Sequence, residues 1–574
     1  MKTASFHKFA KLCKQLEKLS SSISMREKLE DYFKKIPKSS IKYASYFLMG
    51  NINPKYKSND LGIGDKTAVK IVAKAFDKDE KKVKKIFNEK GDMGNVVEKL
   101  NKRKRSSLSL KEVHNTLDNI QKTSGKGSQE KKKEKLADLL KNSTSLEAKY
   151  IIRTALGVLR LGVGDKTILE SFAGAFTKDI KNKNIVENSY AVCTDIGELG
   201  ESLAKNGLEG AKRFSITLGR PVQAMLAQRV KKASDILEKI EGDKLAAEYK
   251  YDGERVQIHK DGKKIQLFSR RLEDITHQYP DLVEYIKKYI KAKKTVIDGE
   301  ILAYKKGKIL SFQKLMHRRR KHDIEKYRKK IPVVVFVFDI LYLNGKSMLK
   351  KPYPERRKQL AKTIDTNSKK VRLAERKTSK KFDEIKDFFE EAIDEGLEGI
   401  IVKSTSKNSI YQPGKRGWLW IKWKKEYAEG MQESFDVVVV GSYHGKGRRK
   451  GMFGALLCAV YNNENDKFET FSKVGAGFTD EDFETIGKKL KKIKVKEKPK
   501  RLKVNKKMKP DIYYDPKMVI EVIGAEITRS PAHTAAEKKG KGLALRFPRF
   551  QNTREDKSAR DTTTVKEIKS LKNK

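Results

Sequence analysis

Lys250-Tyr251-Asp252-Gly253-Glu254-Arg255 is the stretch of this sequence that is most informative about its fold. A K-x-D-G pattern alone is weak evidence in a lysine-rich chain, because chance supplies it readily. Five further segments follow in order, and each fits the chemistry that a reactive lysine at position 250 would need. They are Ser269-Arg270-Arg271, Asp298-Gly299-Glu300, Phe338-Asp339, Glu398-Gly399-Ile400-Ile401-Val402-Lys403 and Trp420-Ile421-Lys422-Trp423-Lys424-Lys425. Six segments in a fixed order are far harder to obtain by chance.

The six segments together resemble the covalent nucleotidyltransferase superfamily, and specifically the ATP-dependent DNA ligases of archaeal and eukaryotic type. The resemblance extends over nearly the whole chain. It implies that AMP from ATP becomes attached to a lysine, passes to the 5′-phosphate at a nick in double-stranded DNA, and leaves when the 3′-hydroxyl attacks. It also implies ATP and Mg²⁺ as cofactors, and a role in DNA replication, repair and recombination.

Two alternatives stay open at this point. RNA ligases and capping-type nucleotidyltransferases share the lysine motif, but they lack a large helical amino-terminal domain. A catalytically inactive DNA-binding scaffold would be expected to have lost Lys250 or one of the acidic positions, and none of them is missing.

Lys250 is predicted to be the catalytic residue and to form a phosphoramidate adduct with AMP. A primary amine attacks an α-phosphate only when it is neutral and held in line. Free lysine has a pKa of about 10.4, so the site must favour the neutral form or take up the proton. The turn Asp252-Gly253 would hold Lys250 at the mouth of a sheet. A charged residue in a hairpin turn is the ordinary alternative for a single lysine, and the flanking segments argue against it.

The resemblance also assigns the residues that bind the nucleotide and the metal. Glu248 lies two residues before Lys250, on the same strand face, and would help to recognise adenine. Glu300 and Glu398 would hold Mg²⁺, which prefers oxygen ligands. Arginine suits bidentate phosphate binding better than lysine does. The expected nucleotide-binding set is Glu248, Arg255, Arg270, Glu300, Phe338, Lys403, Arg416, Lys422 and Lys424.

Aromatic residues near these positions have two interpretations. Phe338 matches the ring that stacks on the base, but ordinary strand core is the alternative, because Phe336 alternates onto the same face. Alternation in a strand would place Lys422 and Lys424 on one side. The chain's three tryptophans lie among these lysines, at Trp418, Trp420 and Trp423. They would serve packing, the nucleotide site, or both on opposite faces.

The composition indicates a polyanionic partner. The 574 residues include 130 Lys+Arg against 75 Asp+Glu, a formal net charge of +55. This excess favours nucleic acid first and an anionic membrane second, although solvated helix faces are the alternative. No apolar stretch approaches the roughly 20 residues of a membrane span, and the amino terminus lacks the apolar segment of a secretory signal. We therefore expect no membrane partner and an intracellular protein, cytoplasmic if archaeal.

Cysteine usage argues against a zinc site. Cys13, Cys193 and Cys458 are far apart and odd in number, so they form neither a C-x-x-C zinc site nor a disulfide framework. NAD-dependent bacterial ligases carry a four-cysteine zinc site, and its absence favours ATP as the nucleotide.

Residues 1–224 are predicted to form an all-α DNA-binding domain with an internal repeat. Leu61-Gly62-Ile63-Gly64-Asp65-Lys66-Thr67 recurs as Leu161-Gly162-Val163-Gly164-Asp165-Lys166-Thr167. The glycines permit a tight turn, and the helix that follows begins with exposed N–H groups, a ready phosphate site. A helix–helix corner that needs glycine only for packing is the alternative. The resemblance favours DNA contacts from Gly62, Gly64, Lys66, Gly162, Gly164 and Lys166.

Two Lys-rich stretches between the repeats, Lys102-Arg103-Lys104-Arg105 and Lys131-Lys132-Lys133, are predicted to be loops. Some archaeal relatives bind a sliding clamp through one Gln and two Phe near the first stretch. Here the sequence is Arg105-Ser106-Ser107-Leu108-Ser109-Leu110, without aromatic residues. A sliding clamp is therefore a partner for which the usual docking motif is not evident. We expect a monomer.

Residues 225–430 are predicted to form an α+β nucleotidyltransferase (adenylation) domain with antiparallel sheets. Its signals include a hairpin at Asp261-Gly262, a buried strand over 333–343 and a helix over 382–393. Residues 431–574, with short strands and basic loops, suit a carboxyl-terminal β-barrel of the OB-fold type. In the family the last motif of this domain swings onto the nucleotide. The residues expected to close the site and orient the leaving group are Arg546 and Arg549.

Overall fold

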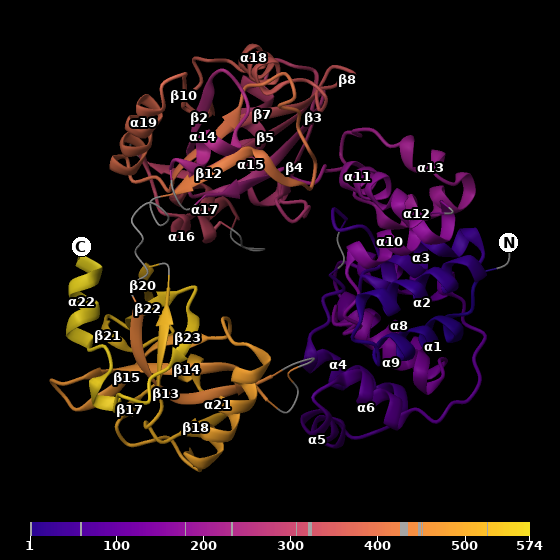
Figure 1. Ribbon diagram of the computed structural model, residues 1–574. Helices are drawn as coiled ribbons and strands as arrows, with labels where there is room; N and C mark the ends of the chain where they lie inside the picture. Colours follow the sequence, from indigo (N-terminus) through magenta and orange to yellow (C-terminus); the bar gives the residue numbers. More distant parts are fainter. Residues whose placement is uncertain are drawn as a thin grey trace. The chain divides into compact units, whose positions relative to one another are not determined.

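The computed structural model describes residues 3–57, 60–177, 179–230, 233–305, 307–318, 324–424, 434–445, 449, 452–524 and 526–573. The chain folds into two compact units, Met1–Lys425 and Glu426–Lys574 (Figure 1). Each unit has hydrophobic cores of its own. Within the described part of the chain, no helix is both long and apolar enough to cross a membrane.

The amino-terminal part of the first unit is built of helices around one core. Phe6, Phe9, Phe33, Phe47 and Phe172 are almost fully buried and pack ring against ring, and each such burial contributes about 1.5–3 kcal/mol. The helices are α1 (Phe6–Leu16), α2 (Ser22–Lys35), α3 (Lys38–Leu48), α4 (Asp65–Phe76), α5 (Glu80–Lys90), α6 (Met93–Leu100), α7 (Leu110–Lys122), α8 (Ser128–Lys141), α9 (Ser145–Ala155), α10 (Asp165–Phe176), α11 (Lys183–Cys193), α12 (Ile196–Asn206) and α13 (Glu209–Lys212).

The two copies of the repeat have the same backbone conformation. Gly62 and Gly162 both have φ of +71°, a left-handed conformation that favours glycine. Gly64 and Gly164 are the N-cap residues of α4 and α10, and neither helix has a side-chain cap. The N-cap side chain therefore satisfies none of the first N–H groups of either helix, although in α10 the Asp165 carboxylate accepts from the N–H of Lys166 at 2.9 Å.

The prediction of a loop at Lys131-Lys132-Lys133 is wrong. These residues lie in α8, because Leu136, Leu139 and Leu140 supply an apolar face at helical spacing. Lys132 is buried, and its Nζ donates a hydrogen bond to the carbonyl oxygen of Leu61, 3.2 Å away. This lysine therefore braces the first turn of the repeat. Residues 102–105 have no regular secondary structure, as predicted.

Two sheets follow in the same unit. The first has the strand order β1-β12-β11-β2-β10, and the second has β4-β3-β5-β7-β8, with β6 paired to β5 and β9 to β7. Most neighbours are antiparallel, as predicted, whereas β1–β12 and β7–β9 are parallel. The first sheet contains β1 (Leu226–Arg229), β2 (Leu245–Lys250), β10 (Arg376–Ser379), β11 (Gly399–Ser404) and β12 (Arg416–Lys424). The second contains β3 (Glu254–Asp261), β4 (Lys264–Ser269), β5 (Lys294–Lys305), β6 (Lys308–Ile309), β7 (Val333–Leu343), β8 (Lys346–Ser347) and β9 (Val371–Leu373).

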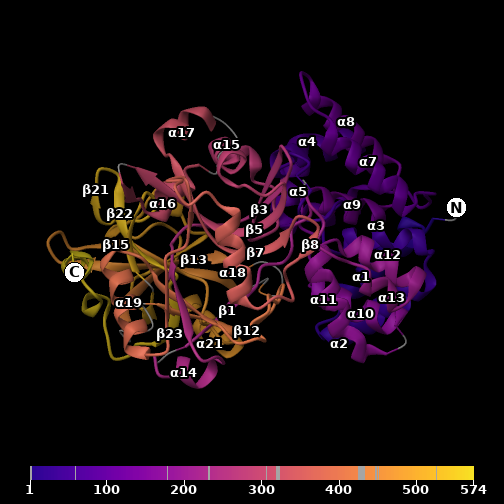
Figure 2. The ribbon, with the colours of Figure 1, turned by 90° about the horizontal axis from the view of Figure 1, so that it is seen from above.

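Helices cover these sheets. Ile385, Phe388 and Phe389 of α19 pack on the first sheet, and Leu282 and Ile286 of α15 pack on the second (Figure 2). The helices of this part are α14 (Asp235–Lys239), α15 (Pro280–Tyr289), α16 (Phe312–Met316), α17 (Ile324–Lys330), α18 (Tyr353–Thr363) and α19 (Phe382–Asp394). The predicted strand over 333–343 is β7, and the predicted helix over 382–393 is α19.

The turn after Lys250 joins the two sheets. Strand β2 ends at Lys250 in the first sheet, and β3 begins at Glu254 in the second. The alternative of an ordinary hairpin at this point is therefore excluded. A Cβ at Gly253 would lie 2.4 Å from the carbonyl oxygen of Ile301, so this crossing requires glycine. The hairpin predicted at Asp261-Gly262 is confirmed, and it joins β3 to β4.

Residues 219–225, here called the connection, tie the helices to the second sheet. Arg255, Gln257 and His259 alternate along β3 and hold the connection at three points. The three bonds are Gly219 N–H to His259 Nδ1 at 3.1 Å, Val222 N–H to Gln257 Oε1 at 2.7 Å, and Arg255 Nη1 to the Met225 carbonyl oxygen at 2.8 Å. The connection is therefore fastened along the strand.

The helices hold the connection from its other side. The Thr194 hydroxyl donates to the carbonyl oxygen of Pro221 at 2.7 Å, and the Gln223 N–H donates to the carbonyl oxygen of Ala191 at 2.8 Å. Val222 is buried in a small core with residues of both sheets. The connection is thus a packed part of the first unit.

The second unit is rich in strands. One sheet has the order β16-β18-β13-β14-β15-β17, with β19 paired to β13 and β23, and a smaller sheet has the order β20-β22-β21. Its elements are β13 (Ser434–His444), β14 (Phe453–Asn462), β15 (Lys467–Val474), α21 (Asp480–Lys492), β16 (Lys494–Val495), β17 (Leu502–Lys503), β18 (Ile512–Tyr514), β19 (Val519–Ile523), β20 (Glu526–Ser530), β21 (Ala535–Lys538), β22 (Lys541–Arg546), β23 (Arg549–Thr553) and α22 (Val565–Asn573). The helical part, the two sheets and this strand-rich unit agree with the predicted fold class.

Candidate active site

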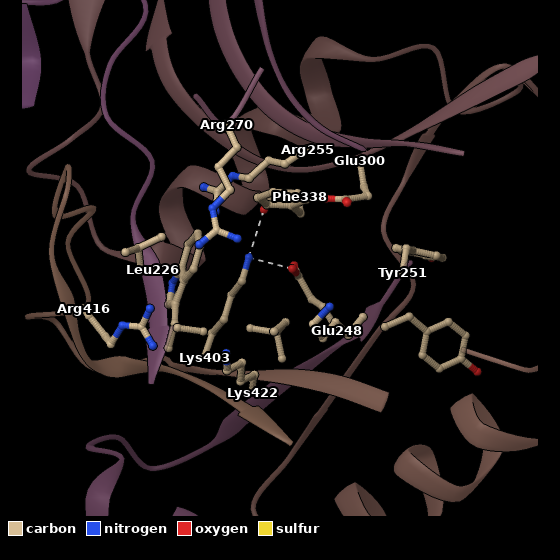
Figure 3. Close-up of a pocket in the computed structure, with 15 residues that line it drawn as sticks. Leu226, Glu248, Tyr251, Arg255, Arg270, Glu300, Phe338, Lys403, Arg416 and Lys422 are labelled. Atoms are coloured by element: carbon tan, nitrogen blue, oxygen red, sulfur yellow. Dashed lines mark hydrogen bonds and ion pairs between the residues drawn. The ribbon is translucent and has the colours of Figure 1, made fainter. Parts of the chain in front are cut away.

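A pocket lies where the two sheets of the first unit meet, and the side chains of both point into it (Figure 3). Lys250 lines this pocket together with most of the predicted nucleotide-binding set. The members that line it are Glu248, Arg255, Arg270, Glu300, Phe338, Lys403, Arg416 and Lys422. The fold therefore gathers residues that lie up to 174 positions apart in the sequence into one site.

Lys250 stands at the end of β2 beside a carboxylate. Its Nζ donates a hydrogen bond to Glu398, and the Nζ of Lys424 lies 2.9 Å from the same carboxylate oxygen. Burial would raise the pKa of Glu398, but the positive charges of Lys250 and Lys424 outweigh it and hold that pKa below its usual value. Glu398 is therefore an ionised acceptor for the amine, and through it Lys424 also belongs to the site.

Glu300 enters the pocket from β5. Burial raises the pKa of its carboxyl to about 7, against the lowering effect of Lys250 and Arg255. Its side chain makes no hydrogen bond or ion pair with any residue that the structure describes. Across the described residues, no group of three or more His, Cys, Asp or Glu is placed to hold a metal. A cation at Glu300 and Glu398 would therefore need further ligands from the substrate, as Mg²⁺ commonly does.

Arg255 is held rigidly at the back of the pocket. Its Nη2 lies 2.8 Å from Asp298 Oδ2, and its guanidinium lies over the ring of Phe338, 5.3 Å from the centroid. The hydroxyl of Tyr411 donates to the same Asp298 oxygen at 2.6 Å. The sequence motif includes Asp298 but does not indicate its function. No local sequence pattern indicates Tyr411. Asp298 therefore orients the arginine that was expected to bind the nucleotide.

The cations Arg270, Arg416 and Lys422 line the same pocket and form a cluster. Burial lowers the pKa of Lys422, and the charges of Arg416, Lys424, Lys250 and Arg270 lower it further. The pKa of Arg270 is also lowered, by burial and then by the neighbouring arginines. Like charges that lower one another's pKa are stabilised when an anion lies between them. This cluster is suited to phosphate.

Glu248 and Lys403 form an ion pair on the floor of the pocket. The Lys403 Nζ lies 2.6 Å from Glu248 Oε2 and 3.2 Å from the carbonyl oxygen of Phe338 (Figure 3). The hydroxyl of Tyr353 donates to Glu248 Oε1 at 2.6 Å. Glu248 and Lys250 lie on the same strand, as predicted, but the sequence gave no signal for Tyr353, which is 105 residues away.

The aromatic residues divide between packing and pocket. Trp423 stacks on Phe389, with ring centroids 4.0 Å apart and an interplanar angle of 4°, so it belongs to the core. Trp420 and Phe338 line the pocket, whereas Phe336 is buried against Tyr251. Trp418 is 41% exposed. Both interpretations of the tryptophans therefore hold, at different positions.

The remaining predicted residues lie outside this pocket. Lys66 and Lys166 are exposed beside the two glycine turns, and a Cβ at Gly64 or Gly164 would meet no atom within 4 Å. Arg546 and Arg549 lie in the second unit, on either side of the turn between β22 and β23. Arg549 is exposed. The structure therefore leaves the two repeat turns accessible and puts the arginines at a strand turn.

Comparisons with known proteins cover nearly the whole chain. Three family models match: DNA ligase N terminus over residues 5–173, ATP dependent DNA ligase domain over residues 224–424, and ATP dependent DNA ligase C terminal region over residues 449–557. A solved structure titled Pmar-Lig_PreS3 covers 95% of this chain, and this chain covers 99% of it, with a TM-score of 0.56 and 17% identity. At that identity the match shows a shared fold.

Curated relatives are similar over their full length. DNA ligase 1 of Methanosarcina acetivorans is 50% identical over 576 residues, covering 99% of each chain. DNA ligase 1 of Methanosarcina barkeri is 52% identical over 541 residues, covering 93% of this chain and 98% of its own. A probable DNA ligase of Aquifex aeolicus is 43% identical over 568 residues, covering 97% of each. With the pocket, the fold and these matches in agreement, the chain belongs to the ATP-dependent DNA ligase family, whose members seal nicks in duplex DNA.

Proposed function

We propose that the chain seals nicks through an AMP adduct on Lys250. The observation that carries this proposal is that the Lys250 amine donates to Glu398 in a pocket that is also lined by the cations Arg270, Arg416 and Lys422. The amine nitrogen would bond to the α-phosphorus of ATP while the bond from phosphorus to pyrophosphate breaks. A 5′-phosphate oxygen would then displace the lysine, and the 3′-hydroxyl oxygen would displace AMP.

Glu398 is placed to prepare Lys250 for attack. The amine must lose a proton before it becomes a nucleophile, and Glu398 already accepts a hydrogen bond from it. Lys424 shares that carboxylate and would keep the amine oriented as the proton moves. A fixed, in-line approach of the amine would contribute much of the rate of group transfer.

Glu300 and Glu398 fit a Mg²⁺ site. Glu300 lines the pocket and has no hydrogen-bond or ion-pair partner among the described residues, and Glu398 contacts Lys250, which also lines it. Bound there with the triphosphate, Mg²⁺ would neutralise charge that repels the nucleophile. The assignment is supported by the Glu300 oxygens, which no described residue engages and which are therefore available to a cation.

The residue ranges suggest a division of labour. Residues 1–224 would bind nicked DNA, 225–430 would carry adenylation, and 431–574 would close over the nucleotide. The uncapped helix ends at Gly64 and Gly164, with Lys66 and Lys166 exposed beside them, support phosphate binding by the repeat. We further propose that the enzyme acts as a monomer inside the cell.

Incubation with labelled ATP, GTP or NAD tests the adduct. We expect ATP and Mg²⁺ to give an acid-labile, alkali-stable AMP adduct, and Lys250→Ala to abolish it. Lys263→Ala, at the exposed tip of the β3–β4 hairpin, is the matched control and should label normally. An adduct that persists in Lys250→Ala would overturn the assignment, and labelling by GTP alone would indicate a capping-type enzyme.

The proposed closing role of Arg546 and Arg549 has its own test. Alanine at either position should slow self-adenylation more than the sealing of a nick that already carries AMP, because pre-adenylated DNA bypasses pyrophosphate release. Equal slowing of both reactions would place these arginines in another role.

A further inference from the structure

A buried polar network forms the floor of the pocket. Glu248, Lys403 and Tyr353 are 2%, 1% and 1% exposed. Both carboxylate oxygens of Glu248 are engaged, Oε2 by the Lys403 ammonium and Oε1 by the Tyr353 hydroxyl, each at 2.6 Å, and the Nη1 of Arg357 lies 3.5 Å from Oε1. Removing a charge pair from water is costly, and apolar side chains of similar size would often be more stable there. A network of this kind at a ligand site therefore points to selection of the ligand.

The Lys403 ammonium, the donor of the pair, makes two hydrogen bonds and has aromatic rings around it. The Lys403 ammonium bonds to Glu248 and to the carbonyl oxygen of Phe338, and the rings of Phe338, Tyr353 and Trp420 lie within 5.1 Å of its nitrogen. The carboxylate, by contrast, has room for further bonds, since an ionised carboxylate accepts about four hydrogen bonds. At the floor of the pocket, the group that remains available to a base is therefore the Glu248 carboxylate, a hydrogen-bond acceptor.

A hydrogen-bond acceptor such as the Glu248 carboxylate can distinguish adenine from guanine and hypoxanthine by the group at position 6 of the ring. Adenine carries an amino group there, which donates a hydrogen bond, whereas guanine and hypoxanthine carry a carbonyl oxygen, which would face the carboxylate with its lone pairs. The same carbonyl could instead accept from an ammonium. Discrimination between 6-amino and 6-oxo purines therefore requires that the Glu248 carboxylate face the base and that the Lys403 ammonium stay bound to Glu248.

Tyr353 is fixed independently of the strand that carries Glu248. It begins α18 directly after Pro352, and its backbone N–H donates to both the hydroxyl and the carbonyl oxygen of Ser409, each at 3.0 Å. The neighbouring Arg356 also donates to the Ser409 carbonyl oxygen, at 2.8 Å. The hydroxyl thus reaches Glu248 from a rigid support.

We propose that Tyr353 is a positioning residue that sets base selection, by holding the Glu248 carboxylate where it accepts from a 6-amino purine and by keeping Lys403 from a 6-oxo purine. The proposal rests on the proposed nucleotide-binding function of this pocket. Without the hydroxyl, the Oε1 of Glu248 would keep only the longer contact with Arg357, at 3.5 Å, and the carboxylate could turn toward that arginine and release the ammonium toward the base.

Self-adenylation of the full chain with ATP, inosine triphosphate and purine riboside triphosphate tests the proposal. These nucleotides carry an amino group, a carbonyl and a hydrogen at the sixth position. Tyr353→Phe should lower the ratio of kcat/KM for ATP to that for inosine triphosphate by about tenfold, the size expected for weakening a hydrogen bond to a charged group. The change should come mainly from KM, and the value for purine riboside triphosphate should move least.

Tyr279→Phe is the matched control. Its hydroxyl donates to Glu254 Oε2 at 2.7 Å in an equally buried position, but neither residue lines the pocket. It should lose stability as Tyr353→Phe does and keep the wild-type nucleotide ratio. An unchanged ratio in Tyr353→Phe would overturn the proposal, as would an equal change in Tyr279→Phe.

Two further observations keep the result interpretable. If Tyr353→Phe does not fold, Glu248→Asp is the second variant, because the shorter side chain keeps the negative charge but moves it away from the Tyr353 hydroxyl. An unchanged ratio of kcat/KM for ATP to that for inosine triphosphate in Glu248→Asp also overturns the proposal. Absence of any ATP adduct on wild-type Lys250 would instead refute the proposed function. The two failures are therefore distinguishable.

Discussion

Glu398 accepts bonds from two lysines at once, and its chemistry depends on being a carboxylate. We predict that Glu398→Gln slows self-adenylation by about 10² or more, the range of a lost proton acceptor, because an amide cannot take the proton of Lys250. Single-turnover labelling with ATP measures this rate. Glu391→Gln, at an exposed position on α19, should leave the rate unchanged. A rate within a few-fold of wild type in Glu398→Gln would contradict the role.

His259 makes folding sensitive to pH. Burial lowers its pKa from 6.5 to about 3, and its Nδ1 must stay unprotonated to accept from Gly219. The unfolded chain therefore takes up a proton that the folded chain refuses. The contribution to stability is complete above about pH 6.5 and is lost as the pH falls below it, by about 1.4 kcal/mol per pH unit. Denaturant unfolding between pH 7.5 and 5 should show this extra slope in wild type and not in His259→Gln.

Among single residues, the sequence indicated most of the side chains that the fold brings into the pocket, but not the residues that support them. Strand alternation indicated that Glu248 lies on the same face as Lys250 and Lys422 on the same face as Lys424, and the family resemblance supplied their expected roles. Neither indicated Tyr353 or Tyr411, because a tertiary hydrogen bond over more than 100 residues leaves no trace in local periodicity.

The two glycine turns allow a test of the repeat as an element. Lys66 and Lys166 are exposed, so replacing them with alanine should hardly change stability. If each neutralises one phosphate, each replacement should reduce the log–log salt dependence of DNA binding by about 0.9, and the double variant by about 1.8. Nicked-duplex binding at several salt concentrations measures this. An unchanged slope would support a purely structural helix–helix corner.

Element boundaries were predicted with unequal success for physical reasons. The strand β7 and the helix α19 have long, regular apolar patterns, and both match their predicted ranges. The prediction of a loop at Lys131-Lys132-Lys133 is wrong because it follows from the run of charge alone, whereas the leucines that come after it form the buried face of a helix. The crossing after Lys250 was not foreseen as a change of sheet, because Asp252-Gly253 suits a hairpin equally well.

For the whole molecule, the connection decides where the chain can be cut. A fragment of residues 225–574 keeps the pocket residues and should still adenylate itself, but it loses buried Val222. A fragment of residues 215–574 retains that contact and should be more stable by about 1.5 kcal/mol. Both should seal nicks poorly and bind DNA with a shallower salt slope than the full chain. Denaturant unfolding, ATP labelling and nick sealing compare them; full sealing activity in either would contradict a DNA-gripping role for the helices.

The hydrogen bonds that hold residues 219–225 along β3 also limit which mutations of this segment can be inherited. Loops elsewhere on a protein tolerate gains and losses of single codons. Here an insertion or deletion of one codon would change the spacing between the Val222 N–H, which bonds to Gln257, and the Met225 carbonyl oxygen, which bonds to Arg255. Both hydrogen bonds could then not form at once. The cost would reach the nucleotide pocket, although the change lies outside it. Among descendants of this gene we therefore expect substitutions in this segment to be common and changes in its length to be rare.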